Sequence, residues 1–140
     1  MSKNDFKTRD LRMVEFSSHL NPQYDGEQYT ATFTMRNGMH INDDTRDGNK
    51  LGSIRCSFEL CAYVDDPEHV YASIKGTAIG QFSVNANTSS EEFQNMLRLN
   101  GILTILPMIR SSVYSISHLL TIKVPMIIPN LDVTKLNWNE

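Results

Sequence analysis

The segment from Asn100 to Leu120, NGILTILPMIRSSVYSISHLL, constrains the fold of this chain more than any other. Its apolar residues recur at steps of three and four, which predicts a helix with a wide apolar face. The main stripe contains Ile102, Ile105, Ile109, Val113, Ile116 and Leu120, and it is widened by Leu99, Leu103 and Leu106. The remaining polar strip is narrow and contains Thr104, Ser111, Ser115 and His118. One face of such a helix can cover a sheet, and the rest of its circumference requires another partner.

The predicted helix has a recognisable start and an internal break. Ser89 stands three residues before Glu92, which is the spacing of a capping box. Helical spacing continues from there to Leu120. Pro107 is expected to kink the helix because it lacks a backbone donor. Ser111, Ser112 and Ser115 are small enough to let a second helix approach closely.

Four earlier segments alternate between apolar and polar residues, which predicts β-strands over 12–20, 28–36, 53–64 and 70–84. In 12–20, Val14, Phe16 and Leu20 share the apolar face. In 28–36, apolar side chains alternate with threonines that are expected to meet water. Gly76 and Gly80 inside the fourth segment predict a bulge or a bend. Four half-buried strands in succession indicate an antiparallel sheet with one apolar face.

The connections and the C-terminal part complete the prediction. Residues 37–50 are interpreted as a long polar connection, and 65–68 as a hairpin turn. Pro125 and Pro129 exclude a helix through 122–129, so this part is expected to be an extended arm, followed by a helical turn or two within 131–138. Residues 1–140 are therefore predicted to form a single α+β domain, a four-stranded antiparallel sheet with a long C-terminal helix packed on one face.

Bulk properties exclude several classes of function. The formal net charge of −3 argues against nucleic acid as a partner, because phosphate binding needs a cationic surface. The longest apolar run, Ile102 to Ile109, is far shorter than the ~20 residues that a membrane-spanning helix needs. The first ten residues lack the apolar region of a signal peptide. Cys56 and Cys61 fall on opposite faces of one predicted strand and cannot pair with each other, so we expect free thiols and a cytoplasmic location.

No motif for catalysis or for metal binding stands out. Residues 43–48 resemble the start of a calcium-binding loop, but Ile54 occupies the position of the required glutamate. The four histidines have no metal-ligand spacing with one another or with the cysteines. No serine stands in a nucleophile elbow, and no carboxylate pair is suited to acid–base work. We therefore expect no cofactor, no metal and no enzymatic activity, although a site assembled from distant residues, or a small-molecule carrier, stays an alternative.

The C-terminal part of the chain is unusually apolar. Fifteen residues include Val124, Met126, Ile127, Ile128, Leu131, Leu136 and Trp138. Two interpretations remain open: the arm packs on the sheet, or it borders a groove for extended apolar peptides. Flexible methionine side chains, such as those of Met35 and Met126, suit a surface that binds many sequences.

The order of these elements resembles the SecB family of export chaperones over about Val70 to Leu136. The similarity runs through GQFSV (80–84), the segment ILPMIR (105–110) within the helix, and VPMIIPNLDVTKL in the arm. Residues 12–64 match in strand pattern only. The resemblance implies a four-stranded antiparallel sheet backed by a long helix, and dimers that pair into tetramers. It also implies a long apolar groove that holds unfolded chains.

The resemblance also suggests roles for particular residues. The peptide-binding candidates, on the second strand and the arm, are Tyr29, Phe33, Met35, Met126, Ile128 and Leu131. The candidates for the oligomer interface, on the polar strip of the helix, are Thr104, Ser111, Ser115 and His118. Ile105, Ile109, Val113 and Ile116 would lie on the sheet.

The sequence departs from the export members in two respects. Those members end in a longer lid helix and an acidic tail that docks on the translocase motor, whereas this chain stops at NWNE and is less acidic, so motor docking is not expected. It resembles instead the divergent Gram-positive or toxin–antitoxin-associated relatives. We expect an ATP-independent, homo-oligomeric protein, a dimer or tetramer, that binds non-native polypeptide in protein transport or a related pathway. A dedicated adaptor of the same fold with one specific partner is the main alternative.

Overall fold

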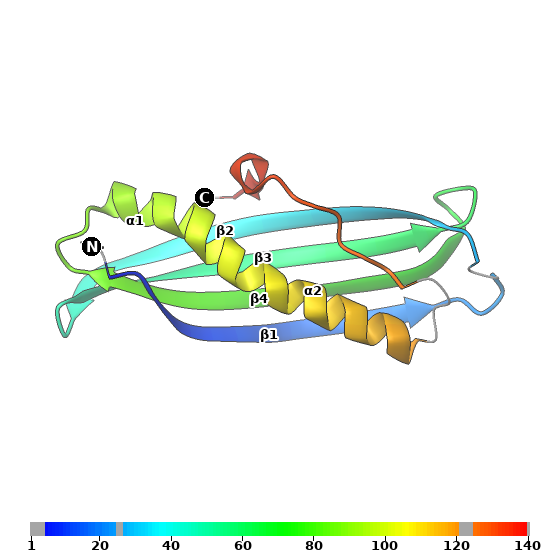
Figure 1. Ribbon diagram of the computed structural model, residues 1–140, viewed down its shortest axis with the longest axis horizontal. Helices are drawn as coiled ribbons and strands as arrows, with labels where there is room; N and C mark the ends of the chain where they lie inside the picture. The colour runs from blue at the N-terminus through cyan, green and yellow to red at the C-terminus, as the bar shows by residue number, and fades with distance from the viewer. Residues whose placement is uncertain (1–4, 25–26, 121–124, 140) are drawn as a thin grey trace.

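The sheet has five strands in the order β1-β4-β3-β2-β5 (Figure 1). The computed structural model describes residues 5–24, 27–120 and 125–139, with 43–46 described by their backbone alone. The strands are β1 (Lys7–Leu20), β2 (Thr30–Arg46), β3 (Asn49–Tyr63), β4 (Val70–Asn85) and β5 (Asn137–Trp138). The first four pair antiparallel, and β5 is parallel to β2. The predicted α+β architecture is confirmed, with one short strand added at its edge.

The alternation in the sequence separates a buried inner face from a polar outer face. On β3, Ile54, Cys56, Phe58, Leu60 and Ala62 are buried, while Arg55 and Glu59 between them are exposed. The threonines of β2 point to the outer face, opposite the side chains of Phe33 and Met35. Cys56 and Cys61 are free thiols on opposite faces, as predicted, and burial raises the pKa of Cys56 to about 12.

The predicted long helix consists of three consecutive parts, α1 (Ser90–Met96), the π-helical η1 (Leu97–Gly101) and α2 (Ile102–Leu119). Ser89 caps the start, where its Oγ accepts a hydrogen bond from the Glu92 N–H at 3.1 Å. The buried side chains of α2 include Ile105, Ile109 and Val113, so the predicted stripe lies on the sheet. The helix runs on through Pro107, and the departure from α-helical geometry lies one turn earlier in η1, where Gly101 packs against the sheet.

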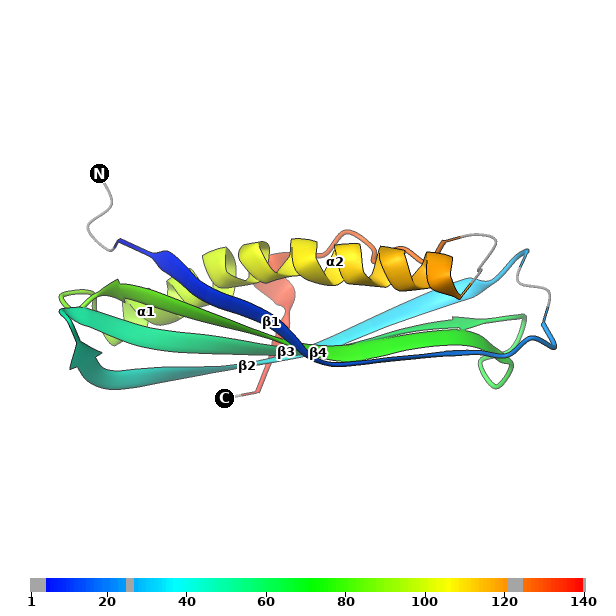
Figure 2. The same cartoon turned by 90° about the horizontal axis from the view of Figure 1, so that it is seen from below.

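The inner face of the sheet is covered by two segments, α2 and the returning arm. Figure 2 shows both on the same side of the sheet, with no helix on the other side among the described residues. The arm from Pro125 crosses toward β2 and ends in the helical turn η2 (Val133–Lys135), which confirms the turn predicted for this part (Figure 1). Residues 122–124 of the predicted arm, including Val124, lie outside the described residues. No helix in the described part of the chain is long and apolar enough to cross a membrane.

The glycines of β4 do not form the bulge that the sequence predicted. The pairing of β4 with β3 is continuous through Gly76 and Gly80, and the irregularities of the β1–β4 pair lie on β1. A Cβ at Gly80 would lie 2.8 Å from the ring of Phe82 and from Ile105 Cδ1. Gly80 therefore makes room for core side chains, whereas Gly76 makes room for the Glu15 backbone oxygen of β1, 2.6 Å from an added Cβ, and for the ring of Phe58. One β1 irregularity also changes the predicted face of Val14, which is 45% exposed.

The predicted polar connection over 37–50 was also wrong, because most of it belongs to strands β2 and β3. These strands form a long hairpin, in which Met39 pairs with Ile54 and Ile41 with Gly52. The turn is made by Asp47 and Gly48, whose φ angles are 52° and 76°. Two consecutive residues with positive φ are typical of the tight turn that matches strand twist. The side chains of Asp43 and Thr45, in the calcium-like sequence, lie outside the described part.

Candidate functional site

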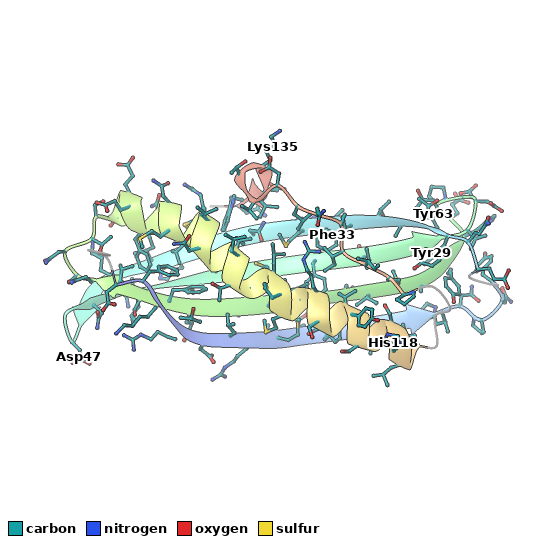
Figure 3. All side chains as sticks on the ribbon, in the orientation of Figure 1. Tyr29, Phe33, Asp47, Tyr63, His118 and Lys135 are labelled. Atoms are coloured by element: carbon teal, nitrogen blue, oxygen red, sulfur yellow. The ribbon has the colours of Figure 1, made fainter. Side chains whose placement is uncertain are left out.

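The six predicted peptide-binding residues lie on the inner face, on β2, on the residue that precedes it (Tyr29) and on the arm. Tyr29, Phe33 and Met35 are only partly buried, as is Leu131. Met126 and Ile128 are 1% and 3% exposed and belong to the core, while Ile127 between them is 70% exposed. Phe33 lies in the first part of β2, and Tyr29 immediately precedes the strand; both are labelled in Figure 3. The arm therefore packs on the sheet, and the side chains of β2 beside it keep part of their apolar surface in solvent.

Two side chains of α2 hold the arm in place. The Arg110 guanidinium donates to the backbone oxygens of Ile128, at 2.7 Å from Nη1, and of Pro129, at 3.1 Å from Nη2. The buried Ser117 Oγ accepts a hydrogen bond from the Met126 N–H at 3.3 Å. Charged donors make the stronger protein hydrogen bonds, so Arg110 is the main anchor. The segment ILPMIR contains Arg110, but its role could not be predicted from the sequence because its partners are backbone carbonyls.

The outer edge of β2 presents unpaired backbone groups. Asn37 pairs with Trp138 of β5, and its backbone oxygen accepts from the Asn139 N–H at 2.7 Å. Because edge-facing groups alternate along a strand, the N–H and C=O of Ala31, Phe33 and Met35 point to the same edge as those of Asn37. Within the described residues, β5 is the only strand on this edge, and it reaches only Arg36 and Asn37.

The C-terminal segment, defined here as residues 136–139, is attached to this edge and to the π-helical turn η1. The Asn37 Nδ2 donates to the Asn137 backbone oxygen at 3.1 Å. The guanidinium carbon of Arg98 lies 6.0 Å from the centre of the Trp138 ring, within reach of a cation–π interaction. An open pocket of about 510 Å³ lies between the C-terminal segment and η1, and its lining includes Leu99, Val133 and Leu136.

The predicted interface residues share the solvent-facing side of α2. Ser111, Ser115 and His118 are exposed, whereas Thr104 is partly buried and donates from Oγ1 to the Asn100 backbone oxygen at 2.7 Å. Apolar side chains of the helix are exposed as well, because Leu103 and Tyr114 of α2 are each 51% exposed and Leu99 of η1 is 45% exposed. Leu99 and Leu103 therefore do not widen the buried stripe as predicted. Figure 3 shows His118 near the end of the helix, where its ring meets that of Tyr114 edge-on at 4.6 Å.

The outer face of the sheet is polar and slightly hollowed. A pocket of about 800 Å³ is lined by side chains of both charges, among them Glu15, Arg36, Arg55, Glu59 and Lys75. Ser57 and Thr77 form a hydrogen bond at its base, with 3.2 Å between their oxygens. Within the described part of the chain, no group of three histidine, cysteine, aspartate or glutamate residues could hold a metal ion.

The pKa of Tyr29, near the start of β2, is shifted by its surroundings. Burial, and then the neighbouring Tyr71, raise the pKa of Tyr29. The two rings lie 6.0 Å apart. The Tyr29 phenol is therefore neutral at physiological pH, and it adds uncharged aromatic surface to this end of the candidate site.

Comparison with known proteins supports the fold. No protein-family model and no curated protein matches the sequence. Among solved structures, the chain is similar to a SecB-like chaperone of Mycobacterium tuberculosis in complex with a ChAD peptide from the HigA1 antitoxin, with 16% identity, a TM-score of 0.64 and 91% of both chains covered. A protein of unknown function from Streptococcus agalactiae matches with 10% identity and a TM-score of 0.49, over 92% of this chain and 100% of that one. The chain therefore has a SecB-like fold.

Proposed function

We propose that this protein binds extended, non-native polypeptide segments along β2, without ATP and without chemical catalysis. The observation that carries the proposal is the coincidence, on one strand, of partly exposed apolar side chains and unpaired backbone groups. Phe33 and Met35 each have a partly exposed apolar side chain and backbone groups that face the unpaired edge. Apolar contact would supply affinity, at ~25 cal/mol per Å² before ordering costs, and backbone pairing would accept almost any sequence.

The fold comparison supports the same proposal. The Mycobacterium tuberculosis protein that shares the fold is a chaperone and was solved with a peptide. In the present chain the arm is fixed by Arg110, so a bound segment would lie beside the arm and against β2. The exposed side chain of Ile127 would add apolar surface at that border.

Binding of a permanently unfolded polypeptide, such as reduced and carboxymethylated α-lactalbumin, tests the proposal directly. We expect binding by calorimetry and slower aggregation of a denatured client. Phe33→Ser should weaken binding about tenfold, as expected when one apolar anchor is lost. Thr34→Ser is the matched control, because it alters the next residue of the same strand on the opposite face. The proposal fails if the unfolded polypeptide does not bind, or if the two variants weaken binding equally.

A dedicated adaptor with one specific partner is the second candidate. It is favoured by the nature of the peptide in the Mycobacterium tuberculosis complex, which comes from a single antitoxin. Affinity capture from a native extract separates the two functions. One dominant bound protein would indicate an adaptor, and many bound proteins would indicate a general chaperone.

We also propose that a second copy of the chain covers the solvent-facing side of α2. Leu103 and Tyr114 stand exposed there among the small side chains of Ser111 and Ser115. Light scattering of the pure protein should give a dimer or tetramer. Leu103→Asp should shift that equilibrium toward the monomer, whereas Lys135→Asp, at an exposed position outside this face, should not. A monomer at high concentration would contradict the proposal.

A further inference from the structure

The side-chain amide of Asn37 is buried on the otherwise apolar face of β2. Asn37 is 1% exposed and lies between Met35 and Met39 on that face. Its Nδ2 donates to the Asn137 backbone oxygen, but its Oδ1 has no hydrogen-bond partner among the described residues. A buried acceptor without a partner is unfavourable, and such groups in folded proteins call for an explanation.

The segment that Asn37 holds has short backbone pairing with the sheet, and its Leu136 and Trp138 side chains pack on the core while staying partly exposed. The strand β5 pairs with two residues of β2, and none of residues 136–139 is buried. The pocket of about 510 Å³ between Trp138, Leu136 and η1 is not filled by the protein's own side chains. Two-residue pairing at an edge contributes little stability by itself, so this segment opens more easily than the rest of the sheet.

The same segment occupies the part of the edge that a bound polypeptide would reach if it continued past Met35. A strand added to β2 opposite Phe33 and Met35 and continued past Asn37 would take the place of β5. Such a strand would pair with edge groups that β5 does not reach, and its backbone N–H groups or polar side chains could donate to Asn37 Oδ1. Two strands cannot occupy one edge at the same residue, so binding of one excludes the other.

We propose that residues 136–139 form a displaceable strand that competes with client polypeptide for β2, and that Asn37 is the residue that grips the backbone of either occupant. This inference rests on the proposed function and adds its regulation. The apparent affinity for clients is then the intrinsic affinity multiplied by the fraction of molecules in which residues 136–139 have left the edge of β2. Because the segment is tethered, it competes at an effective concentration of about millimolar without any second molecule.

Deletion of residues 136–140 tests the competition. Fluorescence anisotropy with labelled, carboxymethylated α-lactalbumin should show about tenfold tighter binding to the shortened chain than to the full chain, which corresponds to a free fraction of about one tenth. A synthetic peptide of residues 132–139, DVTKLNWN, should displace the client from the shortened chain. Equal or weaker binding by the folded, shortened chain would overturn the inference.

Asn37→Ala in the shortened chain tests whether the Asn37 amide binds the backbone of the client. It should weaken client binding about tenfold, whereas Asn95→Ala, which removes an exposed amide on α1, should leave it unchanged. Equal affinities for these two variants would refute the role of Asn37.

Amide hydrogen exchange on the full chain gives a readout that does not depend on variants. Client binding should protect the amides of Phe33 and Met35, which face the edge, and release that of Asn139, which bonds to Asn37. The Thr34 amide, which faces β3, should not change. If the full chain does not bind the unfolded polypeptide at all, the proposed function fails. If it binds while the Asn139 amide keeps its protection, only the displacement fails.

Discussion

Arg110 should decide how firmly the arm is held, and Arg110→Met isolates that role. The substitution keeps most of the apolar stem and removes the two hydrogen bonds from the guanidinium to the backbone oxygens of Ile128 and Pro129. The remaining attachments of the arm are the burial of Met126 and Ile128 and the hydrogen bond from the Met126 N–H to Ser117. The arm should therefore stay docked in most molecules but detach more often.

The magnitude follows from the two bonds. A hydrogen bond made by a charged group contributes ~1.5–3 kcal/mol when shielded, and much less when exposed to water. The bond to Ile128 is partly buried at 2.7 Å, and the bond to Pro129 is exposed at 3.1 Å. Their combined loss should lower the free energy of arm opening by about 2 kcal/mol. That difference corresponds to opening that is roughly 30-fold more frequent.

Amide hydrogen exchange of residues 126–136 measures this opening, and limited proteolysis of the arm gives an independent estimate. Arg55→Met is the matched control, because Arg55 is exposed on the outer face of the sheet. The control should leave exchange in the arm unchanged. If the arm exchanges within about threefold of the wild-type rate in Arg110→Met, the two hydrogen bonds do not anchor it and the reasoning is refuted.

Three further predictions concern stability and thiol chemistry. Ser89→Ala should lower the free energy of unfolding by about 1 kcal/mol, because the Glu92 N–H loses its capping acceptor. Gly101→Ala should lower it by about 1–3 kcal/mol, because the added methyl group would overlap the side chain of Ile54, and urea denaturation measures both changes. An alkylating reagent should label the partly exposed Cys61 before the buried Cys56, as measured by mass spectrometry. Burial raises the pKa of Cys56 from 9.0 to about 12. The contribution of the Cys56 thiol to stability is therefore present below pH 9 and is lost as the pH rises toward 12.

The control for the two stability predictions is an exposed residue of the same continuous helix. Asn95→Ala, at an exposed position of α1, should change the free energy of unfolding by less than ~0.5 kcal/mol. A Gly101→Ala protein as stable as this control would mean that the helix can move away from the sheet at no cost. Equal labelling rates for the two cysteines in the folded protein would contradict the burial of Cys56.

The sequence predicted the layers of this fold because burial imposes periodicity. The period of two in 53–64 and the spacing of Ile105, Ile109 and Val113 each reflect one face packed against the core. The extension of β2 through 37–46 was missed because asparagine, aspartate and glycine are poor strand formers. Pairing along the hairpin overrides that preference, and Met39 and Ile41, followed by the Asp47–Gly48 turn, were the available signal.

The site was harder to predict, because much of it depends on backbone groups. Phe33 and Met35 could be placed from alternation, and the structure leaves them partly exposed as a binding role requires. Arg110 and Asn37 bond to backbone oxygens far along the chain, and no pattern of side chains encodes such partners. The sequence left two interpretations of the arm open, and only the packed structure shows Met126 in the core.

Two of the exposed surfaces have different physical needs. Most backbone groups on the solvent-facing side of α2 are bonded within the helix, so a partner is attracted mainly by side chains such as Leu103 and Tyr114, and a rigid matching face satisfies them best. The edge of β2 has the opposite character, because its unpaired N–H and C=O groups are satisfied by any extended chain. The proposed self-association at the helix and the proposed capture of polypeptide at the strand therefore use different surfaces. A variant at Leu103 should change the oligomer while leaving client-induced exchange protection at Phe33 intact.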